Sequence, residues 1–227
     1  MKKIQLFLLV AISISFVTKS FSQRGRYRIS NGIAITGGIT QFNISTDNFV
    51  TEQGSGFSGG FFSTVDIPHQ WYNISFGFQF AENNFGISAR PTMTDTTNEF
   101  LDYKIMMAQA ALLMNIKVID DYFTIDVGPM LQYGGKLELK EESKANYYIN
   151  NYSNITADAI SNISRFNING AVGASVGIRN FKLRAQYVYG FTNILKKLED
   201  ESLDTSGGND RFKGNQNMLF LGAMISF

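Results

Sequence analysis

From about residue 30 onward, apolar side chains alternate with polar or small ones in one segment after another. The segment 71–80 shows the pattern most clearly. One of its faces carries Tyr72, Ile74, Phe76, Phe78 and Phe80, and the other carries Asn73, Ser75, Gly77 and Gln79. A period of two places successive side chains on opposite faces of a β-strand. Each segment is therefore predicted to be a strand that separates an apolar environment from a polar one.

The chain is rich in hydrophobic residues but has no apolar run of helical length after residue 22. Hydrophobic residues make up 44% of the sequence, with 20 Phe, 10 Tyr and only 3 Pro. A membrane β-barrel distributes its hydrophobic residues in this way, because lipid-facing and lumen-facing side chains alternate along each strand. We therefore expect a barrel rather than a helical membrane protein.

Eight segments show the alternation. They span residues 33–40, 57–66, 71–80, 101–118, 123–133, 166–179, 181–192 and 217–227. The fourth is less regular, because the run 105–108 is also compatible with a helix. We predict a strand there, with the even-numbered residues from 108 to 118 facing outward. Phe62, Met218, Phe220 and Met224 interrupt the inward faces of the second and last segments.

The links between these segments alternate in length. The short links are 67–70, 119–121 and Asn180, and the long links are roughly 43–55, 82–99, 136–164 and 195–215. Outer-membrane barrels have short periplasmic turns and longer extracellular loops. The sequence therefore predicts an all-β fold, an eight-stranded antiparallel up-and-down transmembrane β-barrel. Its N-terminus and short turns are expected in the periplasm and its long loops outside the cell.

Aromatic residues gather where the membrane interfaces are expected, because their rings join an apolar body to polar surroundings. Near the short links they are Trp71, Tyr72, Tyr122, Phe123 and Phe181, and near the long links they are Phe57, Phe80, Tyr133, Phe166 and Phe191.

The N-terminal region resembles an export signal. Lys2 and Lys3 precede a mostly apolar stretch over 4–17, and Ser20 and Ser22 place small residues before a cleavage site between Ser22 and Gln23. Residues 1–22 are thus predicted to be a signal peptide and residues 23–227 the barrel domain. Their removal would change the net charge from +1 to about −2. Such a chain lacks the basic footprint of a nucleic-acid-binding protein.

Catalytic motifs are weak. Ser58 and Ser175 each lie in a G-x-S-x-G pattern, but both segments are predicted strands rather than the strand–turn–helix that a nucleophile elbow requires. The single histidine, His69, falls in a predicted short turn, where we expect it to be solvated. With one His and no Cys, the sequence offers no transition-metal site. We therefore expect neither an enzyme nor a cofactor.

Two features of the long links suggest contacts outside the cell. One feature is a group of four carboxylates, those of Glu199, Asp200, Glu201 and Asp204. The simplest interpretation is that they lie in a solvated loop. Alternatively, they could hold Ca²⁺ or bridge through it to lipopolysaccharide. Tyr147, Tyr148 and Tyr152 lie in an Asn-rich stretch and could form a recognition surface for a protein partner.

Charged residues on the inward faces are expected at similar depth near the short turns. They are Asp66, Lys117, Asp126, Arg179, Lys182 and Arg184. Eight strands enclose an interior that side chains can fill, and charges there are costly unless they are paired. We predict an ion-pair network that plugs the lumen, in which Asp126 meets Arg184 or Arg179. The alternative is that these side chains simply reach periplasmic water.

Several stretches resemble the PorT-like outer-membrane β-barrel family of Bacteroidetes. They are 101–103, 123–133, 166–177 and 183–193, and the terminal Phe227 resembles the signal read by the barrel-assembly machinery. The resemblance implies a barrel that interacts with this machinery during biogenesis and with membrane lipid and lipopolysaccharide. Some members of the family serve type IX secretion, but no residue here singles out that subgroup.

The expected function is therefore that of a structural or interaction protein, with a filled lumen and outer loops that meet a partner. An accessory barrel of a type IX-like secretion machine is the alternative. A small-solute channel ranks below these two readings, and a barrel enzyme below the channel.

Overall fold

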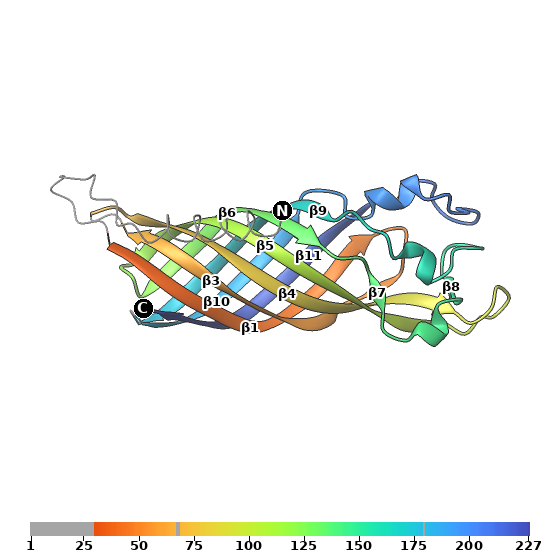
Figure 1. Ribbon diagram of the computed structural model, residues 1–227, viewed down its shortest axis with the longest axis horizontal. Helices are drawn as coiled ribbons and strands as arrows, with labels where there is room; N and C mark the ends of the chain where they lie inside the picture. The colour runs from red at the N-terminus through yellow and green to blue at the C-terminus, as the bar shows by residue number, and fades with distance from the viewer. Residues whose placement is uncertain (1–29, 67–68, 179) are drawn as a thin grey trace, which may run out of the picture.

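The computed structural model describes residues 30–66, 69–178 and 180–227. The predicted signal peptide, its cleavage site at Ser22 and Gln23, and Arg179 lie outside the described residues. Within them, eight long strands form the body of the molecule (Figure 1). They are β1 (Ser30–Thr46), β3 (Gly54–Asp66), β4 (Tyr72–Arg90), β5 (Glu99–Ile119), β6 (Phe123–Gly134), β9 (Phe166–Ile178), β10 (Phe181–Gly190) and β11 (Gly214–Ser226).

The eight strands close into a ring. Each pairs antiparallel with the next along the chain, and β1 pairs with both β3 and β11. The closing seam runs from Ala34 opposite Ser226 to Thr46 opposite Gly214. Because every long strand has two neighbours, no long edge is left open. The predicted eight-stranded antiparallel up-and-down barrel is confirmed, and residues 105–108 lie in a strand.

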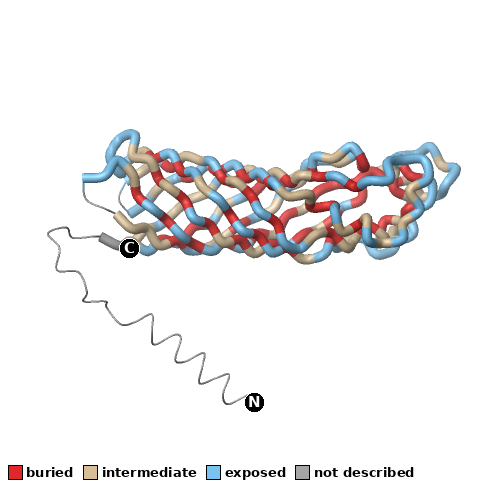
Figure 2. Tube along the Cα trace, turned by 90° about the horizontal axis from the view of Figure 1, so that it is seen from above, coloured by how far each residue is buried: buried red, intermediate tan, exposed pale blue. Residues whose placement is uncertain are grey.

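The alternation predicted from the sequence sets the two faces of the wall. On β4, Phe76, Phe78 and Phe80 are 48–62% exposed, whereas Ser75 and Gln79 are at most 5% exposed. The same pattern appears around the barrel as alternating buried and exposed positions (Figure 2). The apolar residues that interrupt the inward faces point inward: Phe62, Met218 and Phe220 are buried and fill part of the lumen.

Two of the predicted long links are much shorter in the structure. Strands β4 and β5 stay paired as far as Ala89 opposite Glu99, so the link expected over 82–99 is reduced to 91–98. Similarly, β1 continues to Thr46, and only 47–53 remain before β3, with β2 (Thr51–Glu52) paired to β4. A strand needs about ten residues to cross an apolar band. With 19 and 21 residues, β4 and β5 project well beyond it (Figure 1).

The other two long links fold over the end of this extension. The link 135–165 contains β7 (Glu138–Leu139), η1 (Glu142–Lys144), β8 (Tyr148–Ile149) and η2 (Asp158–Ile160), and the link 191–213 contains η3 (Lys196–Asp200). Together with the projecting strands they enclose a second, apolar interior. Its buried side chains include Ile44, Phe85, Ile87, Leu101, Tyr103, Ile105, Ile149, Ile160, Ile163 and Leu195. We call this folded end of the barrel the cap.

Candidate functional site

The outer wall of the barrel carries a continuous apolar surface. Phe80, Ala108, Tyr133 and Phe166 stand in one register row across four strands, and all three rings are more than half exposed. At the short-turn end, Trp71 and Tyr122 are equally exposed. Large apolar patches of this extent are rare on soluble monomers. Among the residues that the structure describes, no helix is long and apolar enough to cross a membrane.

Inside the wall, Asp126 is the centre of a buried polar cluster. Its Oδ1 accepts hydrogen bonds from Asn115 Nδ2 at 2.8 Å and Thr124 Oγ1 at 2.9 Å, and its Oδ2 accepts one from Ser175 Oγ at 2.6 Å. Arg184 Nε lies 3.5 Å from the same Oδ2. Burying a carboxylate requires this degree of compensation, because its charge has lost its hydration.

Five of the six charged residues predicted for the lumen lie in the described ranges, and these five do not form one ion-pair network. Asp126 and Arg184 make one pair, and both side chains are less than 5% exposed. Lys117 makes a separate pair with Asp66 at 2.8 Å, and Asp121 lies 3.7 Å from the same ammonium group. This second group is partly exposed and lies nearer the short turns. Lys182 has no ion-pair partner within the described ranges, and Arg179 falls outside them.

A layer of side-chain amides crosses the lumen between the Asp126 cluster and the cap. Gln79 donates to Gln109 at 2.7 Å, and Gln109 donates to Gln132 at 2.8 Å. Gln132 Oε1 also accepts from Asn169 at 2.9 Å and from Gln216 at 2.7 Å. These five residues come from five strands and are all at most 2% exposed. The amide layer therefore blocks the barrel with groups that satisfy one another.

Sequence reasoning placed several of these amides on inward faces but missed their mutual contacts. The signal lies in the register, which sets Gln79 opposite Gln109 and Gln109 opposite Gln132. Register alone thus reveals the three Gln residues of β4, β5 and β6, whereas Asn169 and Gln216 join the layer through contacts that the register does not show.

The cap closes the barrel beyond the amide layer. Phe49, Tyr152 and Phe212 come from three different links, and their ring centroids lie 5.7–6.0 Å apart. Asn48 Nδ2 donates to Tyr152 Oη at 2.7 Å, and Tyr152 Oη donates to Asn209 O at 3.1 Å. Burial raises the pKa of the Tyr152 phenol. The expectation that Tyr152 belongs to a recognition surface is wrong, since its ring holds the cap together, whereas Tyr147 and Tyr148 are half-buried.

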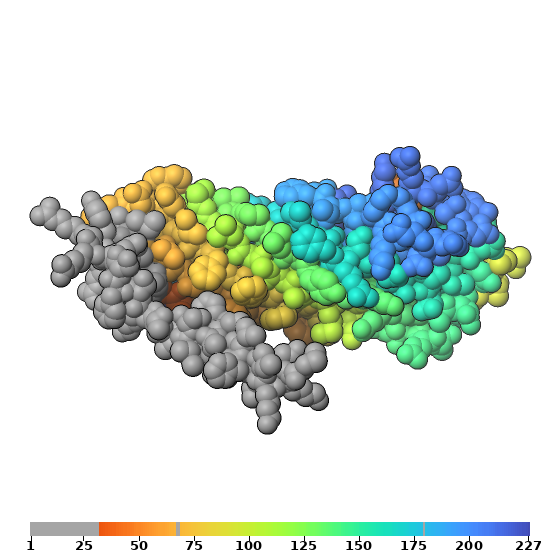
Figure 3. Space-filling model, turned by 45° about the horizontal axis from the view of Figure 1, so that its top comes forward, coloured from red at the N-terminus to blue at the C-terminus, as the bar shows by residue number. Residues whose placement is uncertain are grey.

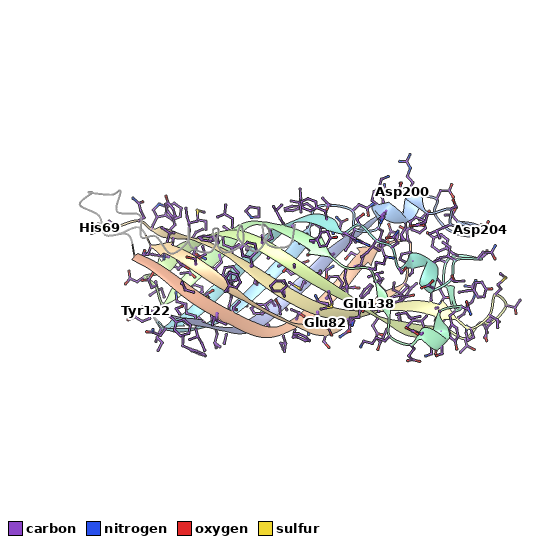
Figure 4. All side chains as sticks on the ribbon, viewed as in Figure 1. His69, Glu82, Tyr122, Glu138, Asp200 and Asp204 are labelled. Carbon is purple, nitrogen blue, oxygen red and sulfur yellow. The ribbon has the colours of Figure 1, made fainter. Side chains whose placement is uncertain are left out.

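Three of the four carboxylates considered for Ca²⁺ have their own side-chain contacts in the cap. Glu199 pairs with Lys196, Glu201 accepts a hydrogen bond from Asn162, and Asp204 accepts one from Asn154. Figure 4 shows Asp200 and Asp204 apart on the outer part of the cap. Within the described part of the chain, no three His, Cys, Asp or Glu side chains are grouped to hold a metal ion.

The residues of the weak catalytic motifs lie on different elements of the barrel. Ser58 and Ser175 are buried on strands, so neither stands on a nucleophile elbow. His69 lies in an exposed turn at the end opposite the cap, with a φ of 66° (Figure 4). Ser175 bonds to Asp126, but no imidazole accompanies this pair, because His69 is the only histidine in the chain.

The last residue, Phe227, extends the closing seam. Its backbone N–H donates to Ile33 O at 2.8 Å, and its ring is among the most exposed apolar groups of the barrel. Its expected role as an assembly signal stays a prediction.

No protein-family model and no curated protein matches the chain. Among solved structures, it is similar to Neisserial surface protein A (NspA), with 12% identity, a TM-score of 0.48, and coverage of 86% of this chain and 97% of that one. It is also similar to the attachment invasion locus protein Ail of Yersinia pestis, with 12% identity, a TM-score of 0.45, and coverage of 87% and 99%. A structure of Ail in a phospholipid bilayer nanodisc gives 15% identity, a TM-score of 0.40, and coverage of 87% and 100%.

Proposed function

We propose that this chain is an integral outer-membrane barrel with a closed lumen, which acts as a structural or interaction protein through its cap. The observation that carries the proposal is the contrast between its two ends. The wall is apolar on the outside, the amide layer crosses the lumen, and the residues beyond the apolar band fold into a compact cap rather than a set of loose loops. A barrel blocked in this way presents a rigid surface at the cap instead of transporting a solute.

The same contrast supports a proposed orientation. We place the cap outside the cell and the short turns in the periplasm, as in barrels with long extracellular loops. The resemblance to PorT-like barrels extends the proposal, since an accessory barrel of a secretion machine would also need a closed lumen and a surface for a partner. Membrane lipid and lipopolysaccharide are the expected surroundings of the apolar wall.

Site-specific photo-crosslinking in intact cells tests the proposal. Met93 lies in the 91–98 link at the tip of the β4–β5 hairpin and is 52% exposed, so a crosslinking amino acid there samples the cap surface. Tyr122, in a short turn at the other end, is the matched control at 58% exposed. We expect a discrete adduct from position 93 that is absent from position 122, and the protein should fractionate with the outer membrane. Recovery in the soluble periplasmic fraction would contradict the proposal.

A further inference from the structure

The barrel is hollow at its short-turn end. A vestibule of about 440 Å³ opens there, lined in part by Asp66, Asn73, Lys182 and Phe227. A smaller cavity of about 40 Å³ lies next to the Asp126 cluster, and its lining also includes Asn73 and Lys182. Thr64 and Met224 line both spaces as well, so the small cavity is the inner end of the vestibule. The space-filling view in Figure 3 shows that the opposite end of the molecule is covered by the cap.

Arg184 faces this inner cavity with unused hydrogen-bonding capacity. The residue is 5% exposed, and its Nε finds no hydrogen-bond partner among the described residues. The Asp126 carboxylate lies 3.5 Å away, longer than a charge-assisted hydrogen bond. The Phe62 ring covers the guanidinium, with its centroid 4.8 Å from Cζ. A guanidinium carries five N–H donors, so a buried one with so few contacts is suited to bind an anion at its free edge.

Lys182 supplies a second cation to the same cavity. It lies two residues before Arg184 on β10, on the same inward face, and lines both the cavity and the vestibule. Within the described ranges no carboxylate lies within ion-pair distance of it: Asp66 and Asp121 pair with Lys117, and Asp126 lies beside Arg184. The remaining residues of the chain contain no Asp or Glu that could do so. The charged side chains that line the inner cavity, Asp126, Lys182 and Arg184, therefore carry a net charge of +1.

Asn73 adds a neutral polar group at the junction of the two spaces. Its side chain is buried, and Oδ1 has no hydrogen-bond partner among the described residues. Because the oxygen and nitrogen of a side-chain amide are interchangeable by a flip, this group can offer an N–H donor to a ligand at the same place. Two buried side chains with unsatisfied polar atoms thus line one small cavity, where buried polar groups are normally paired.

We propose that the inner end of the vestibule is a binding site for one oxyanion, which is a carboxylate or a phosphate group. Arg184 and Lys182 hold this group, and Asn73 lies beside it. One negative charge on the ligand neutralises the net charge of +1 that Asp126, Lys182 and Arg184 give the cavity. Its volume is enough for about three water molecules, so the charged group of a ligand enters while the remainder occupies the vestibule. The ligand reaches the site from the short-turn side, because the amide layer and the cap block the other.

Isothermal titration calorimetry on the refolded full barrel in detergent tests this site. The probes are inorganic phosphate and a short neutral peptide with either a free or an amidated C-terminus. We expect saturable binding at one site per barrel for phosphate, for the free-carboxylate peptide, or for both, and none for the amidated peptide. Binding of phosphate alone would identify the ligand group as a phosphate. Binding of the free-carboxylate peptide alone would identify it as a carboxylate.

Variants of Lys182 make the test specific. Lys182→Gln should weaken binding about tenfold or more, the effect of losing one charge-assisted hydrogen bond. Lys182→Arg should retain it, and Lys213→Gln, at an exposed lysine of the cap, should leave it unchanged. The heat-dependent gel shift of each variant shows that the barrel is folded. Absence of saturable binding for all probes, or equal affinity in Lys182→Gln, would overturn the proposal.

Discussion

Inside the barrel, the Arg184 guanidinium lies 3.5 Å from the Asp126 carboxylate, and both side chains are almost fully excluded from solvent. Asp126 accepts three hydrogen bonds from other side chains, whereas the Arg184 Nε–H donates to no partner among the described residues. The arginine therefore depends on Asp126 more than the aspartate depends on the arginine.

Replacement of Asp126 should strongly destabilise the barrel. Asp126→Asn leaves a buried cation without its counter-charge, and we expect a loss of about 3–5 kcal/mol in the free energy of unfolding. Urea-induced unfolding of the refolded barrel, followed by the fluorescence of the single Trp71, measures this loss.

The matched control is Asp66→Asn, which breaks the partly exposed pair with Lys117. It should cost less than about 1 kcal/mol, because solvent screens an exposed pair. Combining Asp126→Asn with Arg184→Met should recover part of the loss. Equal losses for the two aspartate variants would contradict the assignment of a buried pair.

The amide layer should also contribute measurably to stability. Gln132 takes part in contacts with Gln109, Asn169 and Gln216, so Gln132→Ala leaves several buried groups without partners. We expect a loss of at least about 1–3 kcal/mol. Gln53→Ala, at an exposed amide near the cap, serves as the control and should be nearly neutral. A neutral Gln132→Ala would show that the layer is not the continuous network described.

The cap should lose stability at alkaline pH through Tyr152. Burial raises the pKa of this phenol above its ordinary value of 10.0, so the folded cap holds the proton more tightly than the unfolded chain. Its contribution is complete below about pH 10 and declines as the pH rises through the folded pKa. The difference between the absorbance titrations of the wild type and Tyr152→Phe isolates this one phenol. Ionisation at or below the ordinary value would contradict its burial in the ring cluster.

Deletion of Phe227 should reduce assembly. The residue extends the seam by pairing with Ile33, and its ring is exposed on the apolar wall. We expect a lower yield of folded barrel in the outer membrane, whereas Phe227→Tyr, which keeps an aromatic ring and the backbone contact, should assemble nearly normally. Quantitative immunoblotting of heated and unheated membranes measures both. A normal yield of the truncated chain would contradict the role of Phe227 as an assembly signal.

The barrel wall can be predicted from the sequence because one rule, the alternation of outward-facing and inward-facing side chains, governs it. Phe78 and Gln79 differ in exposure for the simple reason that lipid-facing and lumen-facing positions alternate. The rule fails beyond the apolar band, where Phe85 and Ile87 face inward although they are apolar. There the inside of the barrel is a hydrophobic core covered by loops, so an alternating pattern no longer separates strand from link, and the extents of β4 and β5 could not be predicted.

The composition of the lumen is predictable from the sequence, and its pairing only in part. The sequence places Asp126 beside Arg184 or Arg179, and the structure pairs it with Arg184. Only the register and the depth of each strand separate this pair from the Lys117–Asp66 pair. Tyr152 was misassigned for a similar reason. A tyrosine in a polar link looks like a surface residue until long-range contacts with Phe49 and Phe212 bury it.

Planar-bilayer recording of the purified barrel measures whether its lumen is closed. The amide layer formed by Gln79, Gln109, Gln132, Asn169 and Gln216 crosses the lumen, and the cap covers the end beyond it. We expect the inserted wild-type protein to pass no steady ionic current. A steady, reproducible unit conductance would contradict the plug and place a small-solute channel ahead of the interaction protein proposed here.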